Sequence, residues 1–182
     1  AGLSTAAGIA DYATHSTETA EVQLRSPLCA QPTLAHRVLA SLHRAGHLHR
    51  LVQQNHDGLP QKAGLPQQAL NEIHGACHAP DNPVVPMSGE LRQDLFADLL
   101  ECERTCDLAL AVGTSLCGMN ADRVVRTPAA MAAQGQALGA VVIGLQRTVM
   151  DGAATLRIFG SLDDVLGRLA HELGLGGEPP RP

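Results

Sequence analysis

The segment that most constrains the fold is the run Asp107-Leu108-Ala109-Leu110-Ala111-Val112-Gly113. Apart from its first residue it is continuously apolar and has the length of a strand, without the alternation of a strand that faces water on one side. Such runs are typical of strands buried on both faces in parallel sheets. The run Ala140 to Leu145 has the same character. The sequence therefore predicts a parallel sheet covered by helices on both faces.

Segments with apolar residues at helical spacing separate the strand candidates. They predict helices over 32–45, 91–100, 121–134 and 161–173, and shorter strands over 48–53, 69–74 and 154–159. Ser161, with Asp164 three residues later, is typical of a capping box at a helix start. Strands that alternate with helices define an α/β domain with a mostly parallel sheet.

Composition narrows the choice of partners and compartment. The 182 residues are 45% hydrophobic but include one Tyr, two Phe and no Trp, so aliphatic side chains must fill the core of a single domain. A net charge of -5 gives no general attraction to nucleic acid or anionic lipid, and we expect neither direct nucleic-acid nor membrane binding. An odd number of scattered cysteines indicates an intracellular protein; they are Cys29, Cys77, Cys102, Cys106 and Cys117.

Polar clusters follow four of the predicted strands. They are Gln54 to Gly58, His74-Gly75, Gly113 to Ser115, and Gln146-Arg147. Because the carboxyl ends of parallel strands meet at one edge of a sheet, where ligands bind, we expect these clusters to lie together.

Each cluster also allows a plainer interpretation. The amide and carboxylate groups of Gln54 to Gly58 suit ribose hydroxyls and a carboxamide, but Asp57-Gly58 also fits an ordinary turn. Gly113 to Ser115 suits a cofactor phosphate or a simple helix cap. His74 suits general-base work near neutral pH, although the chain has nine histidines.

In their order and spacing these segments resemble the signature motifs of the sirtuin family. The resemblance covers nearly the whole chain, and the stretch from Asp151 to Leu173 is similar to the nuclear branch that contains sirtuins six and seven. The matching segments are Ala1-Gly2-Leu3-Ser4, Gly8-Ile9-Ala10-Asp11-Tyr12, Gln54-Asn55-His56-Asp57-Gly58-Leu59, His74-Gly75, Pro83-Val84-Val85, Gly89-Glu90, Gly113-Thr114-Ser115-Leu116 and Leu145-Gln146.

The resemblance implies a Rossmann-like domain that uses NAD to remove acyl groups from protein lysines, giving nicotinamide and O-acyl-ADP-ribose. His74 is then the general base, with Asn55 and Asp57 as the other catalytic residues, and the partner is an acylated lysine of a protein such as a histone. Val84, Val85, Gly118 and Met119 are expected to bind the substrate peptide. The residues expected to bind the cofactor are Ala1, Gly2, Ser4, Asp11, Tyr12, Gln54, Asn55, Asp57, Gly113, Thr114, Ser115, Gln146 and Phe159.

The chain departs from the family in several places. Only Ala76 to Asn82 separate Gly75 from Pro83, where sirtuins insert a zinc module with two Cys pairs. Cys77 and His78 alone cannot complete a tetrahedral site, so we expect no metal site and no structural zinc. Further family positions are changed in Tyr12-Ala13, Pro60, Met87-Ser88, Met119-Asn120 and Gly144.

These departures leave alternatives open. We expect a catalytic domain over 1–174, which lacks the family's first strand and the zinc module near 76–82, and a flexible tail over 175–182. One alternative function is an NAD- or peptide-binding module with little or no turnover. Another is ADP-ribosyl transfer or plain NAD cleavage. The expected compartment is the nucleus or the cytoplasm, with the nucleus favoured.

Overall fold

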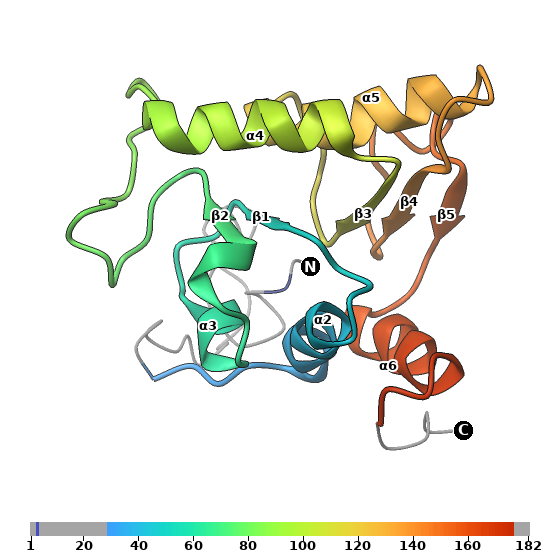
Figure 1. Ribbon diagram of the computed structural model, residues 1–182, viewed down its shortest axis with the longest axis horizontal. Coiled ribbons are helices and arrows are strands. Elements are labelled where there is room, and N and C mark those ends of the chain that lie inside the picture. Colours follow the sequence, from blue (N-terminus) through green and yellow to red (C-terminus); the bar gives the residue numbers. More distant parts are fainter. Residues whose placement is uncertain (1–2, 4–28, 177–182) are drawn as a thin grey trace, which may run out of the picture.

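The computed structural model of the protein describes Leu3 and residues 29–176, and shows strands sandwiched between helices (Figure 1). In chain order the helices and strands are α2 (Leu34–Arg44), β1 (Leu51–Gln53), α3 (Leu59–Lys62), β2 (Leu70–Glu72), α4 (Gln93–Thr105), β3 (Leu108–Val112), α5 (Arg123–Ala132), β4 (Gly139–Ile143), β5 (Leu156–Ile158) and α6 (Leu162–Glu172). Short 3₁₀ turns, η2 (Gln67–Ala69) and η3 (Asn120–Asp122), precede β2 and α5.

The strands form two parallel units. β1 pairs with β2, with Leu51 opposite Leu70, and β3, β4 and β5 form a second unit in that order. Every pairing in the described part of the chain is parallel, which confirms the predicted mostly parallel sheet. No ladder joins β1 to β3 among the described residues.

Strand β4, the central strand of its unit, buries both faces, as its continuous apolar sequence predicts. Ala140 and Val142 of β4 pack in one cluster with residues of α5, while Val141 and Ile143 pack in another with α2 and α6. In Figure 1 α4 and α5 lie on one side of the strands, and α2 and α6 lie on the other. The prediction of helices on both faces is confirmed.

The predicted elements are present, with differences at their ends. The backbone N–H of Asp164 donates to Ser161 Oγ at 3.2 Å, which confirms the cap at the start of α6. Helix α4 runs five residues beyond the predicted end at position 100. The short helix α3 was not predicted; it begins after Gly58, which has a φ of 66° in the left-handed region.

None of the described helices combines the length and apolar character needed to cross a membrane. Residues 1–2 and 4–28, and residues 177–182 of the tail predicted over 175–182, lie outside the described residues, so the domain bounds remain a prediction.

Candidate functional site

Three of the four polar clusters directly follow strands and lie at one edge of the fold. Gln54 comes after β1, His74 comes two residues after β2, and Gly113 comes after β3. The side-chain amide of Gln54 donates to Thr114 Oγ1 at 3.3 Å, and this bond links the end of β1 to the end of β3, which belongs to the other parallel unit. Two residues predicted from separate motifs are thus in direct contact.

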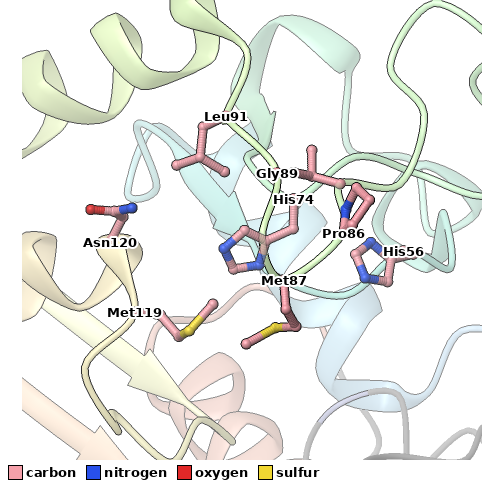
Figure 2. A pocket seen from close by; sticks show the side chains of 9 residues that line it. His56, His74, Pro86, Met87, Gly89, Leu91, Met119 and Asn120 are labelled. Atoms are coloured by element: carbon pink, nitrogen blue, oxygen red, sulfur yellow. The ribbon is translucent and has the colours of Figure 1, made fainter.

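A pocket with a volume of about 150 Å³ surrounds His74 (Figure 2). It brings together three residues predicted for catalysis or substrate binding: His74, Val85 and Met119. Two imidazoles and one amide provide its polar groups, and aliphatic and thioether side chains provide most of the rest. Its other lining residues are His56, Pro86, Met87, Gly89, Leu91 and Asn120.

The pocket wall is formed by the segment after Pro83, which lies close to the end of β2. The backbone N–H of Val85 donates to the carbonyl of His74 at 3.0 Å. Gly75 has a φ of 81°, and a Cβ there would fall 2.8 Å from the Cα of Val84. Gly75 therefore permits the close backbone approach that sets Val85 beside His74.

The environment of His74 favours its neutral form. Burial lowers its pKa most, a hydrogen bond to the backbone of Gln54 raises it, and the neighbouring His56 lowers it further. The charge of Asp122 acts in the opposite direction and raises the pKa. Because the net shift is downward, His74 is a neutral imidazole at pH 7, able to accept a proton.

His56 is a pocket residue that the sequence did not single out. Its Nδ1 lies 2.8 Å from the carbonyl oxygen of Gly75, so the ring is fixed on the turn that follows His74. In Figure 2 the two imidazoles line the same pocket, near Pro86 and Met87. Its position in the segment Gln54 to Gly58, which follows a strand, was the signal that could have identified it.

Asp57 and Asn55 are not among the residues that line the His74 pocket. Asp57 is buried, and its Oδ1 accepts hydrogen bonds from the backbone N–H of Leu59 at 2.9 Å and from Gln53 Nε2 at 3.4 Å. These contacts give Asp57 the turn-stabilising role that was the plainer interpretation of Asp57-Gly58. Catalytic roles for Asp57 and Asn55 remain predictions.

A second part of the edge lies between the ends of β3 and β4. Gly113 and Gly144 both have positive φ values, and a Cβ at Gly144 would come no closer than 3.9 Å to Gly113. Backbone bounded by glycines leaves room for a ligand to approach the strand ends, where dinucleotides bind in folds of this type. These residues fit the binding of a dinucleotide.

Arg157 holds the backbone of this part of the edge through hydrogen bonds. Its guanidinium donates to the carbonyls of Val142, Gly144 and Gln146, at 3.2, 3.1 and 2.6 Å. It also lies 3.8 Å from the centre of the ring of Phe159, a side chain that is 59% exposed. Gln146 and Phe159, both predicted to border the cofactor, are thereby linked through one arginine.

Three further predicted residues lie on exposed segments near the site. Ser115 and Gly118 are exposed and lie on the segment between β3 and η3, and Val84 is 42% exposed beside the pocket wall. The residues expected to bind the cofactor in the N-terminal segment lie outside the described residues: Ala1, Gly2, Ser4, Asp11 and Tyr12.

The shortened loop at 76–82 closes on itself. The backbone N–H of Ala76 donates to the carbonyl of Asn82, and Asn82 Nδ2 donates to the carbonyl of Glu72. His78 packs against Gly58, with its Nε2 3.9 Å from Glu72 Oε1. No group of three or more metal-binding side chains converges within Leu3 and 29–176, and the expected lack of a structural zinc remains a prediction.

Comparison with known proteins shows a similarity to the sirtuins. A profile described as the Sir2 family matches residues 17–81. Sirtuin-7 of Bos taurus is 27% identical over all of this chain, and a protein of Rhodopseudomonas palustris named NAD-dependent protein deacetylase is 29% identical over 76% of it. A structure of Sir2 with an inhibitor, 2′-O-acetyl-ADP-ribose and a deacetylated peptide matches with a TM-score of 0.78 and 23% identity, covering 97% of this chain and 92% of that one.

The chain is thus similar to proteins of the Sir2 family, over residues 17–81 by the family profile and over its whole length by one sirtuin-7. The likeness to sirtuin-7 confirms the predicted relation to the branch that contains sirtuins six and seven. The chain spans 56% of the length of sirtuin-7 of Bos taurus, and 20% of the length of the rat protein is matched.

Proposed function

We propose that this protein removes acyl groups from protein lysines with NAD as co-substrate, releasing nicotinamide and O-acyl-ADP-ribose. The pocket that joins His74 to Val85 and Met119 is the observation that carries the proposal. A neutral imidazole in the wall of a largely apolar pocket suits an acyl-lysine side chain and a hydroxyl that must lose a proton. The relatives named as NAD-dependent protein deacetylases support the same activity.

The residues of the chain divide the work by position. Gln54 and Thr114 tie the two halves of the sheet edge together, and the glycine-bounded ends of β3 and β4 are open to the dinucleotide. When bound, NAD supplies the electrophilic ribose carbon from which nicotinamide leaves. Val84, Val85, Gly118 and Met119 lie on the two exposed segments beside the pocket, where an extended peptide can add as a strand.

His74 moves the proton. Its ring donates to the backbone of Gln54, which leaves the other nitrogen free to accept a proton from a hydroxyl in the pocket. Because burial lowers the pKa of His74, the imidazole is unprotonated and ready at neutral pH. The partner class is an acylated lysine of a protein such as a histone. The similarity to sirtuin-7 supports action inside the cell, with the nucleus favoured over the cytoplasm.

The test is mass spectrometry of a reaction that contains NAD and an acetyl-lysine peptide. O-Acetyl-ADP-ribose should form with the wild-type protein, and His74→Ala should lower its rate about 10²-fold or more while NAD binding by calorimetry persists. The matched control is His47→Ala, an exposed histidine after α2, which should keep full activity.

The same experiment separates the alternatives. NAD binding without any product favours the binding module, and nicotinamide release without O-acetyl-ADP-ribose favours NAD cleavage or ADP-ribosyl transfer. Equal rates for His74→Ala and the wild type contradict the role of His74.

A further inference from the structure

Asp122 is a buried carboxylate beside the pocket. It ends the turn η3 and is 2% exposed. Its Oδ2 accepts hydrogen bonds from the backbone N–H groups of Gly118 at 2.7 Å and Met119 at 3.0 Å. Its own N–H donates to the carbonyl of Met119 at 3.0 Å. One side chain therefore fixes the backbone of the segment that carries two predicted substrate-binding residues.

The conformation of the Gly118–Met119 segment depends on its hydrogen bonds to Asp122. Gly118 has a φ of 107°, and nothing lies within 4 Å of the position a Cβ would take there. Neighbouring side chains therefore do not hold this turn by packing at Gly118, whereas hydrogen bonds to an ionised group are among the stronger ones in proteins. The carboxylate is the contact that defines the position of Met119 in the pocket wall.

The second carboxylate oxygen of Asp122, Oδ1, is in a different environment from Oδ2. Oδ1 is buried and has no hydrogen-bond partner in the part of the chain described. A buried carboxylate is costly unless positive charge lies nearby. The charged and titratable groups that act on His74 are His56 and Asp122, and Asp122 is the one that favours the protonated imidazole, since its charge raises the pKa of His74 against the larger effect of burial.

We propose that Asp122 is a positioning residue of this site: its bonds to Gly118 and Met119 hold that segment for the substrate peptide, and they place a buried carboxylate behind the pocket wall that Met119 shares with His74. This rests on the proposed function. In the reaction His74 changes from a neutral to a positively charged ring when it takes the proton from a hydroxyl. A fixed carboxylate nearby stabilises the charged state, while burial and His56 keep the resting state neutral.

Two substitutions separate the two roles. Asp122→Asn keeps an acceptor oxygen for the two N–H groups but removes the charge, so the acidic limb of the pH profile of kcat/KM should move to lower pH with KM nearly unchanged. Asp122→Ala removes both, so KM for the acylated peptide should also rise about tenfold. The control Asp94→Asn, at an exposed carboxylate on α4, should leave both quantities unchanged.

Two further measurements need no activity. NMR titration of His74 should show a lower midpoint in Asp122→Asn, and the amides of Gly118 and Met119 should exchange faster with solvent in Asp122→Ala. An unchanged His74 titration overturns the charge role, and unchanged exchange overturns the positioning role. A wild-type protein that makes no O-acetyl-ADP-ribose contradicts the proposed function instead, while the two NMR results still decide the role of Asp122.

Discussion

The two halves of the fold are stabilised in different ways. We call residues 51–92, with β1, β2 and α3, the site half, and residues 108–172, with β3 to β5, α5 and α6, the sheet half. Among the described residues, five of the seven buried polar side chains lie in the site half: Gln53, Asp57, Asn71, Glu72 and Asn82. The described part of the sheet half has one such side chain, Asp122, and its core is an apolar cluster between β3, β4 and α5.

The two halves differ because one must hold the backbone of the pocket in place and the other forms the apolar core of the sheet. The site half holds short strands of three residues, so hydrogen bonds between loops fix the backbone around His74 and His56. Each such bond contributes little net stability, but each fixes direction, which a catalytic pocket requires. The sheet half gains its stability from apolar area removed from water, which is insensitive to direction. Hydrogen bonds thus fix most of the backbone around His74 in the site half, and apolar burial supplies most of the stability of the sheet half.

The largest expected effect is in the site half, at Gly75. Gly75→Ala forces a Cβ against the backbone of Pro83 and Val84 at a φ of 81°, and neither backbone can move without displacing Val85. We expect a loss of about 3 kcal/mol or more in the free energy of unfolding, from left-handed strain and overpacking together. Urea unfolding measures this loss.

Gly46→Ala is the matched control for Gly75→Ala. Gly46 has a nearly equal φ of 79° but nothing within 4 Å of the added Cβ, so only the strain remains, about 1 kcal/mol. Equal losses at the two glycines contradict the claim that backbone contact, more than backbone conformation, shapes the pocket.

The sequence predicted the sheet half better than the site half for the same physical reason. The apolar runs that became β3 and β4 are determined by burial, a property that each residue carries by itself. Ser161 and Asp164 likewise form a cap within one short segment. The position of His74 at a strand end was predictable from the same logic.

What could not be predicted depends on contacts between distant segments. Helix α3 follows Gly58 and contains Pro60, residues typical of a turn, and the bond from Leu59 to Asp57 is visible only in the folded chain. His56 enters the pocket because the carbonyl of Gly75, 19 positions away, fixes its ring. Asp122 and Arg157 have no distinctive sequence context, and their roles follow from carbonyls and amides gathered around them by the fold.

Arg157 is an exception in the sheet half, because it stabilises the end of β4 through hydrogen bonds and not through apolar burial. The side chain of Arg157 is 10% exposed. Its guanidinium donates hydrogen bonds to Asp151 and to several carbonyls at and after the end of β4. Lysine keeps the charge but cannot donate in so many directions. Arg157→Lys should therefore lower the free energy of unfolding by about 2 kcal/mol, measured in urea, because buried carbonyls lose their donors.

Arg104→Lys is the control for this effect. Arg104 also donates two hydrogen bonds to a carboxylate, that of Glu101, but its side chain is 71% exposed and no measurable change is expected. A comparable loss in both variants, or none in either, contradicts the view that polar contacts to the end of β4 stabilise the sheet half.

The smallest expected effect concerns His36, which lies on α2 and is 1% exposed. Burial lowers its pKa most, Asp57 and Asp163 raise it, and Arg37 lowers it. As the pH falls below the ordinary histidine pKa of 6.5, His36 takes up a proton in the unfolded chain before it does so in the folded chain. The free energy of unfolding is therefore at its full value above pH 6.5 and decreases as the pH falls below it. Nε2 has no partner in the described structure, which explains why the charged ring is disfavoured.

His36→Asn tests this dependence, because the amide oxygen can replace Nδ1 as the acceptor for the N–H of Thr33. Urea unfolding at pH 7 and pH 5 should show a smaller loss of stability in the variant than in the wild type, whatever its stability at pH 7. The same substitution at the exposed His47 should leave the wild-type difference unchanged. If His36→Asn loses as much stability on acidification as the wild type, the acid sensitivity of the fold arises elsewhere, and the buried carboxylates of the site half, Asp57 and Glu72, become the groups to substitute next.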